Sequence, residues 1–123
     1  MNAAEKQAWI DDLESGKYFH GKKRLKIVEA GLVSHCCLGV LVETLGAAIL
    51  PMELECGDDH RGESKTEFNR IKDNGEEFGY EWFEKITGLT AGKIAVLYSI
   101  NDGEETVGFK RQADWIRLNV VPK

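Results

Sequence analysis

The segment from Leu32 to Leu45 is the longest apolar run in the chain and the feature that most limits its fold. It begins as a predicted short strand and passes into a helix at the adjacent Cys36 and Cys37. Apolar residues then recur at helical spacing and form a broad apolar face. A helix of this kind belongs at the centre of a core. Gly39 within it costs about 1 kcal/mol relative to alanine, which predicts a close packing contact there.

The overall composition is typical of one globular domain. The chain has 123 residues, of which 42% are hydrophobic and only two are proline. This length can bury a core without a metal or disulfides, so we expect a single domain over residues 1–123. The net charge of -5 argues against non-specific nucleic-acid binding, because neutralising phosphates requires a basic face.

The sequence also favours one cellular compartment. No apolar run approaches the roughly 20 residues of a membrane span, and residues 1–9 lack the basic start and apolar stretch of a signal peptide. Three cysteines, two of them adjacent, do not make the disulfide framework of a secreted protein. We therefore expect a cytoplasmic protein with reduced thiols and no membrane contact.

Capping and turn residues predict the elements before the central helix. Asn2 and Glu5 form a capping-box pattern for an N-terminal helix that ends at Gly16. Residues 24–28 alternate between apolar and polar positions, Glu29-Ala30-Gly31 supplies a turn, and residues 32–35 return as a second strand, which predicts a β-hairpin. This hairpin leads directly into the central helix.

The second half of the chain predicts one long loop and further helices. Residues 47–75 are rich in turn residues, and we expect a mobile loop there, with one helical turn around Phe68 and Ile71. A short aromatic helix is expected before Gly88, a longer one after the N-cap Thr90, and a last one near the end of the chain. The order predicts a small α+β domain: N-terminal helix, hairpin, buried central helix and C-terminal helices.

Several short motifs follow one another in an order known from one protein family. They cover most of the chain except residues 47–79: Trp9, Ser15-Gly16-Lys17-Tyr18, Gly21, Cys36-Cys37-Leu38-Gly39-Val40-Leu41, Leu97-Tyr98-Ser99-Ile100-Asn101-Asp102-Gly103, Phe109 and Ala113-Asp114-Trp115-Ile116. With these motifs the chain resembles a family of small proteins of tailed bacteriophages and prophages. It departs from the family pattern at Val42, where a third cysteine is usual, and at Ile100, where leucine is common.

This resemblance implies phage origin and says little about chemistry. Phage proteins of this size often bind and modulate a host protein, including components of antiviral defence, which is an argument by analogy. The leading hypothesis is therefore a phage-encoded cytoplasmic accessory protein that binds and modulates or inhibits a host bacterial protein. We expect no enzymatic activity, because the sequence contains no catalytic triad order, metalloprotease motif or phosphate-binding loop.

Acidic and aromatic residues alternate between Asp73 and Glu84 and suggest where a partner would bind. Exposed aromatic side chains ringed by carboxylates would suit a protein interface. Core packing of Trp82 and Phe83 is the favoured interpretation of those two residues. The candidate partner-binding residues are Asp58, Asp59, Glu76, Glu77, Tyr80, Glu81 and Trp82.

The first alternative is a small-ligand (nucleotide) or metal-binding protein centred on Cys36 and Cys37. The two cysteines follow His35 at a predicted helix N-terminus, where a helix dipole and an imidazolium can lower a thiol pKa. Zinc could also draw on Cys56 and His60, but adjacent cysteines are not the usual spaced pair. Buried cysteine is a common small apolar residue, so core packing is favoured and no metal or cofactor is expected.

The second alternative is a nucleic-acid binder that uses the basic run from Lys22 to Lys26. Tyr18, Phe19 and His20 lie just before this run and would supply aromatic rings on which bases stack. Lysines in turns and edge strands also discourage unwanted strand pairing. That structural role is the favoured interpretation, given the acidic charge of the whole chain.

Overall fold

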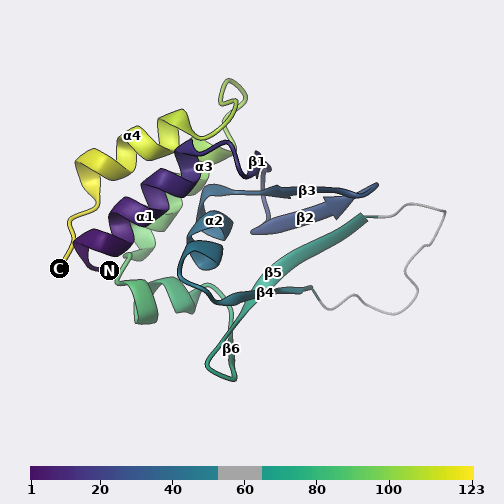
Figure 1. Ribbon diagram of the computed structural model, residues 1–123, viewed down its shortest axis with the longest axis horizontal. Coiled ribbons are helices and arrows are strands. Elements are labelled where there is room, and N and C mark those ends of the chain that lie inside the picture. Colours follow the sequence, from purple (N-terminus) through teal and green to yellow (C-terminus); the bar gives the residue numbers. More distant parts are fainter. Residues whose placement is uncertain (53–64) are drawn as a thin grey trace.

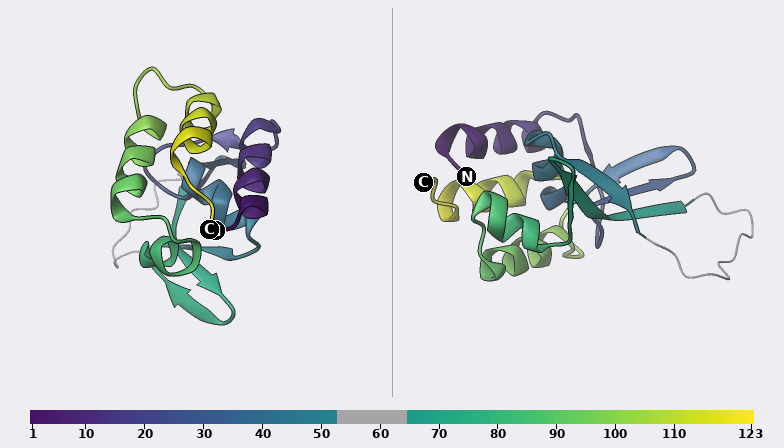
Figure 2. Two further views of the ribbon diagram at one scale, coloured as in Figure 1. Left: turned by 90° about the vertical axis from the view of Figure 1, so that its left-hand side faces the viewer. Right: turned by 90° about the horizontal axis from the view of Figure 1, so that it is seen from below.

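The computed structural model describes residues 1–52 and 65–123. Its fold is α+β, as the sequence predicts. The helices gather at one end of the molecule, and the strands project from them (Figures 1 and 2). The elements are, in order, α1 (Ala3–Glu14), β1 (Phe19–His20), β2 (Lys26–Glu29), β3 (Leu32–His35), α2 (Cys37–Thr44), β4 (Ala48–Pro51), β5 (Lys65–Asp73), β6 (Glu76–Phe78), the π-helical turn η1 (Phe83–Thr87), α3 (Ala91–Asn101) and α4 (Lys110–Asn119).

Helix α1 begins with the capping box that the sequence predicts. The Asn2 side chain accepts from the Glu5 N–H at 2.8 Å, and the Glu5 carboxylate accepts from the Asn2 N–H at 2.9 Å. Both bonds satisfy donors that the first helical turn leaves free. At the buried face, the Trp9 indole N–H donates to the Cys37 carbonyl at 2.9 Å. This bond fixes α1 against α2.

The sheet has the strand order β1-β3-β2-β5-β4, and β6 lies outside this order and pairs with the C-terminal part of β5. Strand β1 runs parallel to β3, and the other neighbours are antiparallel. The predicted hairpin is confirmed as β2 and β3, with Glu29 opposite Leu32. Its turn residues, Ala30 and Gly31, have φ values of 52° and 81°. Two successive left-handed residues match the twist of the flanking strands.

The predicted long loop over residues 47–75 is wrong at both ends. Ala48–Pro51 forms β4, and Lys65–Asp73 forms β5, so the helical turn expected around Phe68 and Ile71 is a strand instead. Strand β5 pairs with β2 and β4, which are distant in the sequence, and with β6, which follows it directly, and these partners stabilise a sequence with weak apolar alternation. The middle of the predicted loop, residues 53–64, lies outside the described residues.

Helix α2 lies at the centre of the core, as predicted. Its residues from Cys37 to Val42 are all buried. A Cβ built on Gly39 would lie 1.9 Å from the Leu25 carbonyl oxygen, so only glycine fits at this position. The predicted close contact at Gly39 is therefore a contact with the backbone that leads into β2.

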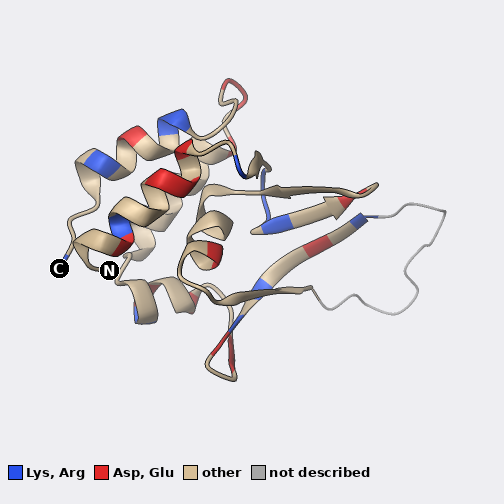
Figure 3. Ribbon diagram, in the orientation of Figure 1, with Lys and Arg blue, Asp and Glu red and all other residues tan. Residues whose placement is uncertain are grey.

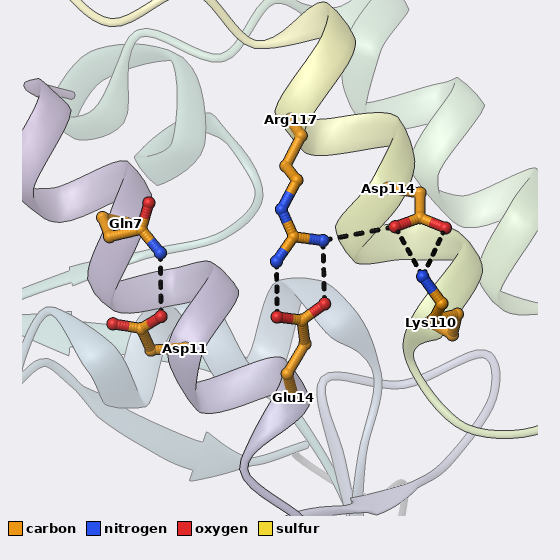
Figure 4. A network of polar contacts seen from close by, with 6 residues as sticks. All are labelled: Gln7, Asp11, Glu14, Lys110, Asp114 and Arg117. Carbon is orange, nitrogen blue, oxygen red and sulfur yellow. Dashed lines mark hydrogen bonds and ion pairs between the residues drawn. The ribbon is translucent and has the colours of Figure 1, made fainter.

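Helices α1 and α4 are joined at the surface by a network of polar contacts (Figure 4). Both carboxylate oxygens of Glu14 accept from the Arg117 guanidinium, and Asp114 accepts from Arg117 and from Lys110. Hydrogen bonding to Arg117 is the main reason why the pKa of Glu14 is lowered. These groups are in contact with water, so the network orients the helices and adds little to stability.

The contact at Gly39 can be tested by substitution. We expect Gly39→Ala to lower the free energy of unfolding by about 2 kcal/mol or more, because the methyl group would collide with the Leu25 carbonyl and overpack the core. The control is Gly92→Ala in α3, where the nearest atom is 4.0 Å away. Helix propensity alone should raise stability there by about 0.5–1 kcal/mol. Urea unfolding of both variants is the measurement, and equal stabilities would contradict the assigned contact.

Candidate functional site

Cys36 and Cys37 are core residues in the structure. The Cys36 sulfur caps α2 by accepting from the Gly39 N–H at 3.4 Å, and the Cys37 N–H donates to the Asn101 side chain at 3.1 Å. Both side chains are fully buried. Burial raises the pKa of Cys36 to about 12 and that of Cys37 well above its usual value. Both groups therefore stay protonated at neutral pH, which disfavours a thiolate nucleophile or ligand.

His35, the third residue of the predicted thiol site, contacts Glu43 and Tyr18. Its Nε2 lies 2.9 Å from a Glu43 carboxylate oxygen, and the Tyr18 ring packs edge-on against the imidazole at 4.9 Å. The hydrogen bond with His35 is the main reason why the pKa of Glu43 is lowered. Among the described residues, no hydrogen bond joins the His35 ring to either thiol. His35 therefore connects β3 to α2.

The part of the chain that the structure describes holds no cluster of three or more His, Cys, Asp or Glu side chains that could bind a metal. Cys56 and His60, the other zinc candidates, lie outside that part. The expectations of no cofactor and no catalysis stay predictions. None of the described helices is long and apolar enough to cross a membrane.

The basic run from Lys22 to Lys26 does not form one basic face. Three of its side chains contact separate parts of the fold: the Lys22 ammonium donates to the Gly103 carbonyl at 3.0 Å, Arg24 donates to Glu67 at 2.9 Å, and Lys26 lies 4.8 Å from the centre of the Phe68 ring. These contacts fit the structural interpretation of the run. Because the three side chains have separate partners, they do not form the continuous row of cations that would contact successive phosphates of a nucleic acid.

The acidic and aromatic segment is divided between core and surface. Trp82 is fully buried and donates its indole N–H to Asp73 at 2.9 Å, so it is not available as an exposed anchor. Tyr80 is half-buried, stacks on Tyr98 at 5.6 Å and donates its hydroxyl to Asn69 at 2.9 Å. Burial raises the Tyr80 pKa well above its usual value. The candidate aromatic anchors thus belong to the packing of the fold.

The carboxylates of the same segment face the solvent. Glu76, Glu77 and Glu81 are exposed, and Glu77 pairs with Arg70. Glu76 and Glu77 lie on β6, where acidic residues mark the outer end of the β5–β6 hairpin in Figure 3. The other two candidates, Asp58 and Asp59, lie outside the described residues.

A buried polar junction formed by His20, Asn101 and Gln112 was not predicted. The Asn101 side chain is fully buried, accepts from Gln112 at 3.0 Å and donates to the Gly21 carbonyl at 2.9 Å. The His20 ring contacts the Asn101 carbonyl through Nε2 at 2.8 Å, and its Nδ1 accepts from the Gly108 N–H at 3.2 Å. Burial is the main reason why the pKa of His20 is lowered. The junction holds β1 against the helices.

Exposed apolar side chains gather where β1 meets β3. Phe19, Leu32 and Val33 expose 69%, 70% and 38% of their surfaces. A hollow of about 720 Å³ opens beside them, and its lining includes Ile27 and Ser34. We name this region, Phe19, Leu32 and Val33 with the adjoining hollow, the β3 edge. Its exposure could not be read from the sequence, because the apolar run from Leu32 predicts burial along its whole length.

Comparison of the chain with protein-family models, with curated proteins and with solved structures gave no match. The phage origin implied by the sequence motifs stays a prediction. The functional argument therefore depends on the geometry of this chain and on the motifs of its sequence.

The buried thiols can be tested by chemical labelling. In a Cys56→Ser background, we expect Cys36 and Cys37 to react with a thiol reagent at neutral pH far more slowly in the folded protein than in urea. The reasons are their full burial and their raised pKa values. Mass spectrometry of the time course is the measurement. Labelling of the folded protein as fast as in urea would show that a thiol is accessible.

The His20 pKa predicts a pH dependence of stability. The unfolded histidine titrates near 6.5, whereas the folded residue has a lower pKa. The unfolded state therefore binds the proton first, and the free energy of unfolding should fall as the pH drops below about 6.5 toward the folded pKa. Urea unfolding at a series of pH values should show this slope in wild type and a shallower slope in His20→Gln. If wild type and His20→Gln showed the same slope, His20 would not be the source of the pH dependence of stability.

Proposed function

We propose that this protein is a binding module that engages a second protein through the β3 edge. The observation that carries the proposal is that Phe19 and Leu32 expose 69% and 70% of their surfaces beside the same hollow. Burying a large apolar side chain contributes about 1.5–3 kcal/mol of favourable free energy. Phe19 and Leu32 do not gain this free energy in the free protein, so a partner that covers them would gain it on binding. Exposed apolar groups gathered at a concave surface are typical of protein-binding sites.

The other exposed large apolar side chains of the described residues come from separate elements. They are Ile86 in η1, Val96 on α3, Val107 in the loop before α4, Leu118 on α4 and Val121 after that helix. Single apolar residues of this kind are normal on a protein surface. The β3 edge combines an exposed aromatic ring, exposed aliphatic groups and a hollow, which favours it as the contact surface.

The proposed partner is a host bacterial protein, with the chain acting in the cytoplasm as a phage accessory protein that modulates or inhibits it. This part of the proposal is supported by the motif resemblance. Cys36 and Cys37, which are free thiols in the structure, are compatible with a reducing compartment.

The exposed carboxylates of the β5–β6 hairpin are a second candidate surface for the same function. Glu76 and Glu81 are exposed and could attract a basic partner. The aromatic side chains beside them are packed in the fold, so this surface has charges but lacks the apolar anchors that supply most interface energy. We therefore rank it below the β3 edge.

Partner capture from a bacterial lysate distinguishes the two surfaces. The double variant Phe19→Ser/Leu32→Thr removes the exposed apolar groups, and the matched variant Glu76→Lys/Glu81→Lys reverses two charges on the second surface. We expect the first to reduce capture of a wild-type partner by at least about tenfold, since an anchor residue is typically worth 1–2 kcal/mol or more. The second should leave capture nearly unchanged.

Quantitative mass spectrometry of the captured proteins is the readout, with unfolding curves to verify that both variants fold. Capture that survives the loss of Phe19 and Leu32 but is lost on charge reversal would move the site to the β5–β6 hairpin. Capture unaffected by either variant would contradict both surfaces.

A further inference from the structure

Strand β1 covers only half of β3. The two strands pair at two positions, Phe19 with Ser34 and His20 with His35, and the parallel pairing extends no further. On its other side β3 is paired over its whole length, with Val28 opposite Val33 and Glu29 opposite Leu32. Within the described residues, the outer side of Leu32 and Val33 therefore has no strand beside it.

The backbone of Val33 faces this open side. The Gly21 N–H donates to the His35 carbonyl at 2.7 Å, so the backbone groups of His35 point toward β1. Residues two apart on a strand point their backbone groups the same way, which directs the Val33 N–H outward as well. In the described part of the chain no loop carbonyl accepts from it. The Val33 N–H is thus a backbone donor that an additional strand at this edge could use.

Hollows flank the open edge on both faces of the sheet. Leu32 and Val33 line both hollows. The larger one, about 720 Å³, also includes Ser34, which shares a face with Leu32, and the smaller one, about 350 Å³, also includes His35, which shares the other face with Val33. Because side chains alternate between the faces of a strand, a strand laid along this edge would place successive side chains in opposite hollows.

The charges around the edge indicate what kind of segment fits. Lys22 lines the larger hollow, and its ammonium donates to a neutral carbonyl, so that bond does not cancel its charge. Lys17 lines the smaller hollow with 62% of its side chain exposed, and its contact with Asp12 is long at 3.9 Å. Glu29 lies on the larger hollow as well, but on β2, away from the edge. The charged residues that line the two hollows are thus Lys17, Lys22 and Glu29, a net charge of +1 in a chain of net charge -5, and the two lysines are those nearest the edge.

We propose that the partner binds by strand addition: an extended segment with alternating apolar residues and at least one carboxylate pairs with β3 beside Val33. This inference rests on the proposed function and specifies its binding mode. Backbone hydrogen bonds would supply affinity, and the two hollows would select side chains. A second copy of this chain is disfavoured as the occupant, because edge-to-edge pairing would bring the lysines of both copies together.

The test uses a displayed library of random dodecapeptides selected on the intact wild-type protein. We expect enriched sequences in which apolar residues alternate with others and Asp or Glu is over-represented. The best synthetic peptide should bind Phe19→Ser/Leu32→Thr and Lys17→Glu/Lys22→Glu at least about tenfold more weakly. Binding to Glu76→Lys/Glu81→Lys, the matched control, should be unchanged.

An N-methyl scan of that peptide tests the strand geometry directly. A methyl group on an amide that faces β3 removes a hydrogen bond, whereas one on the next amide faces away from the sheet. Affinity measured by calorimetry should therefore alternate with a period of two residues. A flat scan, a helical period, enrichment without alternation, or no peptide that requires the β3 edge would each overturn strand addition.

The outcome for strand addition is separable from that for the proposed function. Partner capture that depends on Phe19 and Leu32, together with a flat N-methyl scan, would keep the binding module and reject the mode. A dimer in native mass spectrometry that is lost in Phe19→Ser/Leu32→Thr would identify a second copy as the occupant and reject the acidic segment. If neither capture nor peptide binding depends on the β3 edge, both proposals fail.

Discussion

The side-chain amide of Asn101 is the contact on which the arrangement of helices and sheet depends. Its oxygen accepts from the Cys37 N–H and from Gln112, and its nitrogen donates to the Gly21 carbonyl and to Asp102. These four bonds use the full capacity of a primary amide. Because Asn101 is fully buried, loss of any partner would leave a polar group without water. One residue thus fixes α2, α3, α4 and the segment after β1 relative to one another.

This junction also determines where the sheet is covered and where it is open. Gly21 and His20, both held by Asn101, end the short strand β1 at the level of His35. The contact of Gly39 with the Leu25 backbone holds the start of β2 against α2 in the same region. The parts of β2 and β3 near their common turn extend beyond these anchors, away from the helices (Figures 1 and 2). The β3 edge is therefore open because the core contacts end before it.

The elements that the sequence predicts well are those that local interactions specify. The Asn2–Glu5 capping box and the hairpin with its Ala30–Gly31 turn are examples. Strand β5 was missed because two of its three partners, β2 and β4, lie far before it in the sequence, and Ile71 is its only fully buried residue. The favoured core packing of Trp82 and Phe83 is confirmed, whereas the sequence did not single out the exposed Phe19 as part of an apolar surface. That difference depends on which face the distant elements cover.

The same tertiary dependence limits prediction of the candidate site. Its residues carry no catalytic or ligand-binding signature, and the sequence drew attention instead to Cys36, Cys37 and the acidic segment. The asparagine at the end of α3 and the glutamine in α4 offered a signal for the buried junction, since amides at apolar helix positions need partners. No comparable local signal marks a strand edge that a neighbour covers halfway.

The short length of β1 has a consequence for self-association. A fully open edge strand can recruit identical chains one after another and form extended polymers. Here β1 occupies the inner half of the edge, and lysines line the hollows beside it, Lys17 the smaller one and Lys22 the larger one. Each incoming copy would meet both obstacles. The sheet can thus stay receptive to a foreign segment at concentrations where an uncharged, full-length edge would aggregate.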